Sequence, residues 1–202
     1  MPHDPVTYFT TLPAGPALYW LWGVWYASWL ISLFWAGKPS ARVAPSAHIL
    51  NQLATIAGVL LLFLLPATRV APHPLWQVSE NTGWILFGLT ALCFLFAWWA
   101  RLTMGRLWSG MVSRLADHRI VDTGPFAIVR HPIYTAVIIA GFLLAAEVGT
   151  AEALAGATCL LLGFWLKARI EEDFLRRELG PEPYDAYRRR VPMLIPFGPK
   201  NA

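Results

Sequence analysis

Side chains that can bind anions and move protons gather in two short stretches of the C-terminal half. The first has a turn followed by a polar run: Gly124, Pro125, Val129, Arg130, His131, Pro132 and Tyr134. Proline is favoured at the first position of a helix, so Arg130 and His131 should stand just before a helix N-terminus. Free N–H groups there, together with the guanidinium of Arg130, favour a carboxylate ligand. This stretch is predicted to form one wall of a small-molecule pocket, although a contact of Arg130 and His131 with lipid headgroups is an alternative.

The second stretch carries acidic and aromatic residues: Glu171, Glu172, Asp173, Tyr184 and Tyr187. Periodicity alone favours a solvated helix face, because Glu172 can pair with Arg176 four residues later. Glu171 fits that interpretation less well, since Leu175 occupies its i+4 position. The two tyrosines can equally pack beneath a tail helix, and residues 188–190, all arginine, suit anionic lipid.

Other kinds of site lack their usual sequence signatures. The fifteen glycines include no Gly-x-Gly pair, which argues against a dinucleotide fingerprint. The five histidines have no metal-ligand spacing with the cysteines, so no metal site is predicted. Cys93 and Cys159 lie within apolar runs, and a disulfide framework is not indicated.

The elements that position these residues are apolar helices. Hydrophobic residues make up 56% of the 202-residue chain and charged residues only 14%, which is outside the usual soluble range. Residues 17–35, 49–65 and 82–100 carry no charge and approach the ~20 residues that cross a bilayer as helix. Residues 132–146 and 153–166 read as a tight helical hairpin. An amphipathic helix is expected after residue 166, ending at Gly180 and Pro181, with a short helix following.

The sequence thus predicts an all-α, polytopic membrane protein with five transmembrane helices and a C-terminal cytoplasmic amphipathic helix. We expect a single domain over residues 1–202, with three membrane helices in 1–100 and the catalytic half in 101–202. With the N-terminus outside, Arg69 is the only basic residue of the outer segments, which satisfies the positive-inside rule. The C-terminus and the site should therefore be cytoplasmic, at the cell (inner) membrane. Topology explains the net charge of +4, so no nucleic-acid partner is expected.

The spacing of both stretches resembles that of the isoprenylcysteine carboxyl methyltransferase family, over roughly residues 101–197. The elements that match are Gly124-Pro125-Phe126, the run from Val129 to Tyr134, Glu171-Glu172 with Leu175, Tyr184, Tyr187, Val191-Pro192 and Ile195-Pro196. The resemblance implies an integral membrane enzyme that uses S-adenosylmethionine, releases S-adenosylhomocysteine and methylates a hydrophobic or lipidated substrate entering from the bilayer. The N-terminal half carries no motif, so the acceptor is not specified.

Roles follow from the resemblance residue by residue. Arg130 with Glu171 or Glu172 would lie at the reacting end. Residues implied to contact the cofactor are Gly124, Val129, His131, Pro132 and Tyr134, with Trp108 and Ser109 closing the adenosine side. Tyr184 and Tyr187 would brace the tail helix or line the pocket.

Other functions remain open from the sequence. Within methyltransferases, a carboxylate, a phospholipid amine or a small thiol can be the acceptor. An NADPH-dependent reductase of the sterol or steroid type is similar in its C-terminal half. A membrane scaffold with a basic, lipid-binding tail is the non-enzymatic alternative.

Overall fold

The computed structural model describes residues 13–35, 41–42, 45–67, 74–105, 113–114 and 120–200. The α-helices are α1 (Ala14–Ile31), α2 (Ile49–Val59), α3 (Leu65–Ala67), α4 (Glu80–Met104), α5 (Pro132–Val148), α6 (Ala151–Leu179) and α7 (Pro181–Arg190). Shorter helical turns are η2 (Ser32–Trp35), η3 (Pro45–His48), the π-type η4 (Leu60–Leu64) and η6 (Gly124–Ala127). The strands β1 (Ala41–Arg42) and β2 (Ser113–Arg114) form one short antiparallel pair. The described chain is therefore almost wholly helical, as predicted.

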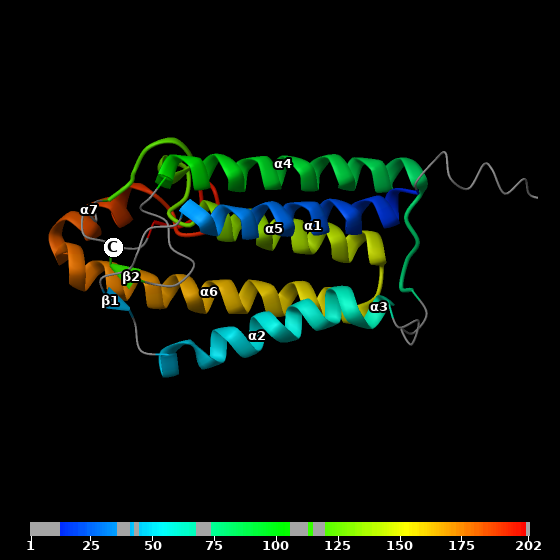
Figure 1. The fold of residues 1–202 in the computed structure, drawn as a ribbon, viewed down its shortest axis with the longest axis horizontal. Coiled ribbons are helices and arrows are strands. Elements are labelled where there is room, and N and C mark those ends of the chain that lie inside the picture. The colour runs from blue at the N-terminus through cyan, green and yellow to red at the C-terminus, as the bar shows by residue number, and fades with distance from the viewer. Residues whose placement is uncertain are drawn as a thin grey trace, which may run out of the picture.

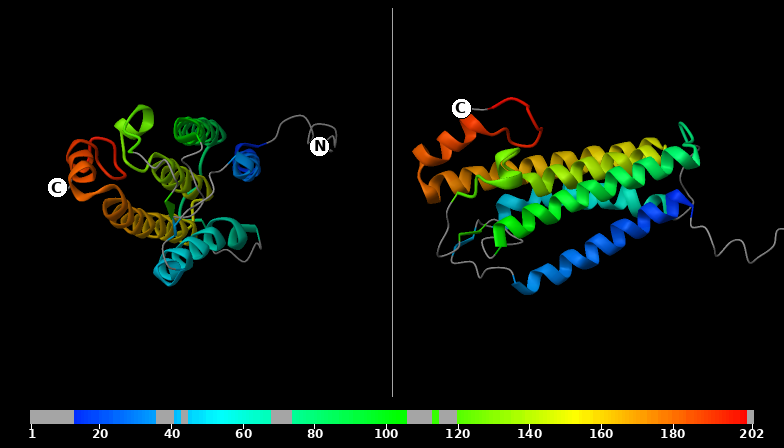
Figure 2. Two further views of the ribbon diagram at one scale, coloured as in Figure 1. Left: turned by 60° about the vertical axis from the view of Figure 1, so that its left-hand side comes forward. Right: turned by 90° about the horizontal axis from the view of Figure 1, so that it is seen from above.

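Five helical rods run the length of the bundle and alternate in direction (Figure 1). They are α1, α2 continued by η4 and α3, α4, α5 and α6. The start of α1 lies at the same end as the start of α4, because the amide of Ala14 donates to Glu80 (2.9 Å). At the other end α4 and α6 finish, α5 begins and α7 is attached (Figures 1 and 2). The two polar stretches are thus brought to one end of the bundle.

The tight α5–α6 hairpin is confirmed. Gly149 ends α5 with φ 72°, and any Cβ there would collide with the carbonyl of Trp76. Only glycine adopts that left-handed conformation at little cost. The hydroxyl of Thr150 then caps α6 by accepting from the amide of Ala153 (3.2 Å). Two residues therefore suffice to reverse the chain.

The amphipathic segment after residue 166 is a continuation of α6 and not a separate helix. The 29-residue α6 includes both the apolar half of the hairpin and the polar half that bears Glu171 and Glu172. Nothing in the sequence breaks the helix between them, because no glycine or proline occurs from residue 164 to residue 179. Glu172 is consequently held on the same rigid rod as the membrane-facing residues.

A close crossing of α2 and α6 fixes one side of the bundle. A Cβ on Gly58 would lie 2.9 Å from the carbonyl oxygen of Gly156, and one on Gly163 would lie 3.0 Å from the amide nitrogen of Thr55. Absent side chains at these positions let the two backbones approach. The main buried cluster lies beside this crossing and contains residues from α1, η4, α4, α5 and α6, among them Leu18, Leu62, Phe94, Leu144 and Leu160.

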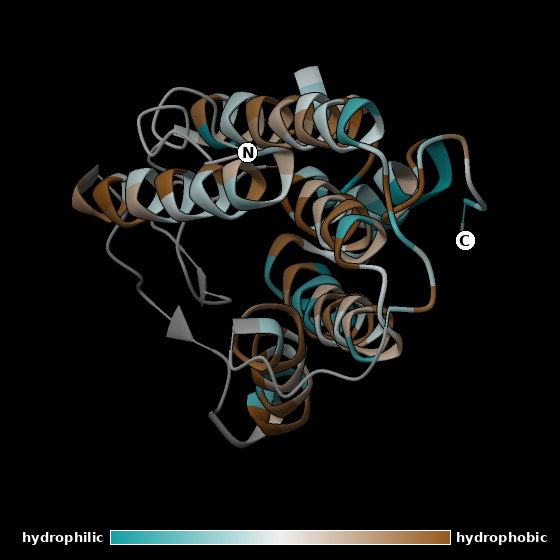
Figure 3. Cartoon of the chain, turned by 90° about the vertical axis from the view of Figure 1, so that its right-hand side faces the viewer, coloured by the Kyte–Doolittle hydropathy of each residue, from teal (hydrophilic) through white to brown (hydrophobic). Residues whose placement is uncertain are grey.

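The outer surface of the bundle is apolar. Among the described residues, three helices are long and apolar enough to cross a membrane, namely Ala14–Phe34, Glu80–Met104 and Ala151–Leu179. Two shorter apolar helices are Ile49–Leu64 and Pro132–Val148. Brown, hydrophobic ribbon dominates the rods in Figure 3, and many large side chains such as Trp20, Phe34 and Leu95 are exposed. Lipid is the solvent that suits such a surface. The count of five membrane crossings and the orientation stay predictions.

Candidate active site

The loop before α5 carries Arg130 into a buried position against α6 and the tail. The Nε of Arg130 donates to Oε1 of Glu172 across 2.6 Å, and the two side chains are 1% and 4% exposed. The Nη1 of Arg130 donates to the carbonyls of Arg188 (3.1 Å) and Val191. Its Nη2 is buried and has no hydrogen-bond partner within the described part of the chain. A charged donor that is buried without a partner is costly, which makes Nη2 a natural contact for an anionic ligand.

His131 and Tyr134 extend this cluster along the first turn of α5. The Nε2 of His131 lies 3.3 Å from Oε1 of Glu172, and its ring stacks on that of Tyr134 with centroids 5.3 Å apart. The hydroxyl of Tyr134 donates to Oε2 of Glu171 (2.7 Å). Glu171 is one-quarter exposed, whereas Glu172 is buried. The two adjacent glutamates therefore have different surroundings, one linked to Arg130 and one to Tyr134.

The C-terminal tail takes up the two backbone amides that immediately precede α5. The amide of Arg130 donates to the carbonyl of Pro192 (2.9 Å) and that of His131 to the carbonyl of Met193 (3.1 Å). The hydroxyl of Thr135 adds a bond to the carbonyl of Leu194 (2.7 Å). The amides of Arg130 and His131 are therefore not available to an anion, because residues 192–194 run alongside and satisfy them, whereas an anion at the first turn of α5 stays a prediction.

Tyr184 and Tyr187 brace the tail, one of the two roles expected of them. Both are buried in a cluster with Val191, and the hydroxyl of Tyr187 donates to the carbonyl of Phe126 (2.7 Å). Burial raises the pKa of both phenols, and the nearby Glu172 raises that of Tyr184 further. They therefore join α7 to the turn at residues 124–127 as neutral hydrogen-bonding and packing groups.

The simple pairing of Glu172 with Arg176 on one helix face is wrong. Arg176 instead makes a two-pronged contact with Asp185 of α7, its Nε and Nη2 each lying 2.9 Å from a carboxylate oxygen. Glu172 points to Arg130, and Arg188 lies 3.5 Å from its second oxygen. Helical spacing could not reveal this, since the partner that wins is 42 residues distant and buried.

The remaining predicted site residues lie partly before or at the start of α5 and partly outside the described residues. Val129 is fully buried, Pro132 is the first residue of α5, and Gly124 opens η6 with φ 58°. Trp108 and Ser109 lie outside the described residues.

Two contacts escaped the sequence analysis, those of Thr135 and Lys167. Lys167 lies on α6 with its Nζ 5.2 Å from the centroid of the Tyr134 ring. Its position one turn before Glu171 is the only sequence signal that pointed to it. In the part of the chain that the structure describes, no group of three or more His, Cys, Asp or Glu could hold a metal ion.

Comparison with known proteins places this cluster in context. Methanethiol S-methyltransferase 2 of Bradyrhizobium diazoefficiens is 29% identical over 168 residues, which is 77% of this chain and 62% of that protein. The nickel-cobalt-cadmium resistance protein NccN of Alcaligenes xylosoxydans is 34% identical over 99 residues, 46% of this chain and 44% of the relative. The cobalt-zinc-cadmium resistance protein CzcN of Cupriavidus metallidurans is 33% identical over a stretch of the same length. The matches thus span less than two thirds of each relative.

The family match covers most of the site. Residues 84–176 match the model of the isoprenylcysteine carboxyl methyltransferase family, a segment that holds Arg130, His131, Tyr134 and both glutamates. The resemblance read from the motifs is thereby confirmed. With its apolar helices, the match supports a membrane methyltransferase. Over residues 84–176, a little under half of the chain, the protein is therefore similar to the isoprenylcysteine carboxyl methyltransferase family.

Proposed function

We propose that this protein transfers a methyl group from S-adenosylmethionine to a hydrophobic or membrane-associated acceptor at the cytoplasmic face of the membrane. The observation that carries the proposal is the buried ion pair of Arg130 and Glu172 with an unpartnered Nη2 beside it. The similarity of residues 84–176 to the family supports the reaction class. We also propose that the chain is a single domain that crosses the membrane five times, which the alternating directions of the helices support. The N-terminus is proposed to lie outside, because basic residues gather at the site end of the bundle.

The residues of the cluster suit the amino-acid part of the cofactor. A carboxylate matches the free Nη2 of Arg130, because guanidinium and carboxylate groups form strong, directional hydrogen bonds. The carboxylates of Glu171 and Glu172 suit positive charge, and the stacked rings of His131 and Tyr134 offer an apolar surface. We assign binding of the cofactor to this cluster, with Gly124, Val129 and Pro132 shaping the loop behind it.

S-adenosylmethionine supplies an electrophilic methyl group on a sulfonium, and the protein's task is alignment and exclusion of water. Arg130 is well suited to orientation, since three of its contacts fix the guanidinium plane. Glu172 keeps that guanidinium in place and balances its charge. The buried phenols of Tyr184 and Tyr187 hold α7 over this end of the site and keep water from the ion pair.

A thiol is the acceptor that the structure favours among the candidates, ahead of a carboxylate. A thiol must lose a proton on methylation, and the Tyr134–Glu171 hydrogen bond leads from the buried cluster to a partly exposed carboxylate. In this proposal Tyr134 passes the proton to Oε2 of Glu171, and solvent takes it from there. The methanethiol S-methyltransferase relative is consistent with this acceptor class. A carboxylate acceptor would leave the pair without a role.

Calorimetric titration of the purified chain in detergent tests the proposal. S-adenosylmethionine and S-adenosylhomocysteine should bind with one site each, and Arg130→Ala should weaken both. Absence of binding at millimolar cofactor would contradict the methyltransferase assignment. A thermal shift with NADPH in place of S-adenosylmethionine would favour the reductase alternative. If neither cofactor changes the melting temperature, the result favours the alternative of a membrane scaffold.

Turnover of small thiols, fatty carboxylates and phosphatidylethanolamine, each measured with labelled cofactor, then separates the acceptor classes.

A further inference from the structure

The tail beyond the site ends in a turn that exposes two large apolar side chains. This tail turn, residues 195–198, is closed by a hydrogen bond from the amide of Gly198 to the carbonyl of Ile195 (2.9 Å). Ile195 is 67% exposed and Phe197 is 97% exposed, although Val191 and Leu194 of the same tail are buried. Exposing a phenylalanine to water forfeits the free energy its burial would provide.

The backbone of the tail turn is also strained to achieve this. Phe197 has φ 62°, the only positive φ at a non-glycine residue among those described. A bulky residue in that region is strained and persists only when its surroundings hold it there. The strained backbone and the exposed ring occur at the same residue, and contact with a partner outside the protein would offset both costs.

The position of the tail turn relative to the bundle identifies that partner. Leu194 is hydrogen-bonded to Thr135 in the first turn of α5, so Ile195 lies level with the beginning of an apolar helix. The seventeen residues of α5 reach only about 25 Å, less than the ~30 Å hydrocarbon core. The first turn of α5 therefore lies at or inside the boundary of the membrane. The right-hand view of Figure 2 shows the red tail folding back from α7 toward the bundle.

The charges around the tail turn match the surface of a bilayer. Arg189 before it and Lys200 after it are both exposed. Basic side chains attract anionic headgroups near the membrane surface, and apolar side chains beside them enter the interface. We propose that the tail turn inserts Ile195 and Phe197 into the bilayer interface at the site end and so anchors the strand that holds Arg130. This inference rests on the membrane location and is independent of the methyl-transfer proposal.

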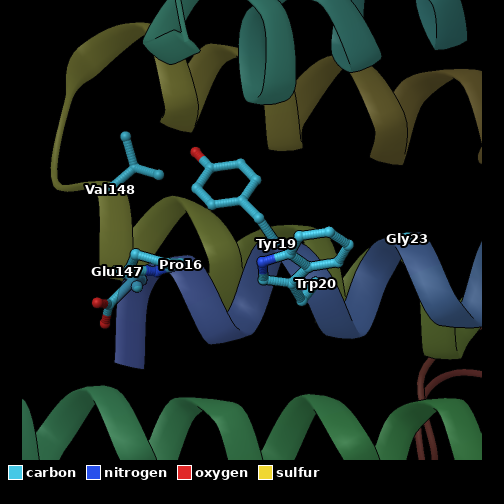
Figure 4. Close-up of a pocket in the computed structure, with 7 residues that line it drawn as sticks. Pro16, Tyr19, Trp20, Gly23, Glu147 and Val148 are labelled. Carbon is cyan, nitrogen blue, oxygen red and sulfur yellow. The ribbon is translucent and has the colours of Figure 1, made fainter. Parts of the chain in front are cut away.

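One pocket in the described chain lies away from both the site and the tail turn, and it carries no comparable argument. It lies at the opposite end of the bundle, where Gly15, Pro16, Tyr19, Trp20 and Gly23 of α1 face Glu147 and Val148 of α5 (Figure 4). Its volume is about 660 Å³ and it is widely open. Nothing around it distinguishes a bound ligand from ordinary lipid.

Fluorescent labelling in nanodiscs tests the anchor on the full chain. Cys93 and Cys159 are replaced by alanine, and Ile195→Cys is labelled with an environment-sensitive nitrobenzoxadiazole dye. Glu182→Cys, exposed on α7, is the matched control. In discs that contain phosphatidylglycerol, the label at 195 should emit at shorter wavelength than the control. It should also be quenched several-fold more strongly by lipids that carry a doxyl group near the headgroup.

Adding Phe197→Ser to the labelled Ile195→Cys protein should reverse much of both effects, because the larger anchor is then lost. Equal emission and quenching at 195 and 182 would overturn the proposal. A blue shift at 195 that needs two copies of the chain per disc, and vanishes at one copy, would overturn it as well, because the turn would then bind a second protein.

Discussion

The guanidinium of Arg130 and the carboxylate of Glu172 lie 2.6 Å apart in the protein interior, although 42 residues separate them in the chain. This contact joins the loop before α5 to the polar half of α6, and the tail segment at Val191 and Pro192 adds backbone bonds to the same arginine. Three segments therefore depend on one ion pair. Its two members should be coupled in stability as well as in cofactor binding.

A double-mutant cycle measures that coupling. Arg130→Met or Glu172→Met alone should lower the free energy of unfolding by about 3–5 kcal/mol, since each leaves a buried charge without its shortest ion pair. The double substitution should cost clearly less than the sum of the two. Reversible unfolding in mixed detergent micelles provides the measurement. The matched control is the exposed pair of Arg176 and Asp185, whose removal should leave stability unchanged within error. Additive losses at the buried pair would show that Arg130 and Glu172 are not coupled.

Removing the hydroxyl of Tyr134 should slow turnover while leaving the fold intact. Tyr134→Phe retains the ring that stacks on His131 but loses the hydrogen bond to Glu171. If the pair accepts the proton of a thiol, kcat should fall about 100-fold or more, with little change in cofactor affinity. Steady-state rates across pH 6–9 with a small thiol check this.

Glu171→Gln should have the same effect as Tyr134→Phe on kcat, because it removes the proton acceptor. At saturating S-adenosylmethionine, a carboxylate substrate, which has no proton to lose, should be methylated with the same kcat by both variants and the parent, although Glu171→Gln weakens cofactor binding by removing a negative charge. Full thiol turnover in either variant argues against the relay.

Tyr187 should limit stability at alkaline pH. Its pKa is raised by burial in the folded protein, so above about pH 10 the unfolded chain loses a proton that the folded chain retains. The stabilising contribution is complete below the unfolded pKa and is lost as pH rises toward the folded one. Melting temperature should therefore fall above pH 10.

Tyr187→Phe should flatten that alkaline fall while lowering stability at pH 7 by about 1 kcal/mol, because the carbonyl of Phe126 loses its donor. Melting curves at pH 7 and pH 10.5 give both quantities. Identical pH profiles in the variant and the parent would mean that another group controls alkaline unfolding.

The crossing of α2 and α6 should tolerate no side chain at Gly163. A Cβ there would lie 3.0 Å from the amide nitrogen of Thr55 and closer still to its hydroxyl, so Gly163→Ala should destabilise by roughly 1–3 kcal/mol. Gly88→Ala on α4 is the matched control, since no atom lies within 4 Å of its Cβ position. Thermal unfolding of both variants decides whether the helices touch as described. Equal melting temperatures would show that α2 packs elsewhere.

The sequence by itself determined the helices and the hairpin. Apolar runs of membrane length and the Gly149-Thr150 reversal are local features, and local physics decides them. The order of the motifs was enough to predict the family resemblance and to propose Arg130, His131, Tyr134, Glu171 and Glu172 as site residues before any contact was known.

Only the tertiary structure decided which charge meets which. Helical spacing predicted that Glu172 would pair with Arg176. In the structure Glu172 pairs with Arg130, which is buried and distant in the chain, and local periodicity does not encode that contact. The same holds for the amides before α5, which the tail strand takes up. Long-range pairing depends on how helices pack, and that information lies in the whole chain rather than in any one segment.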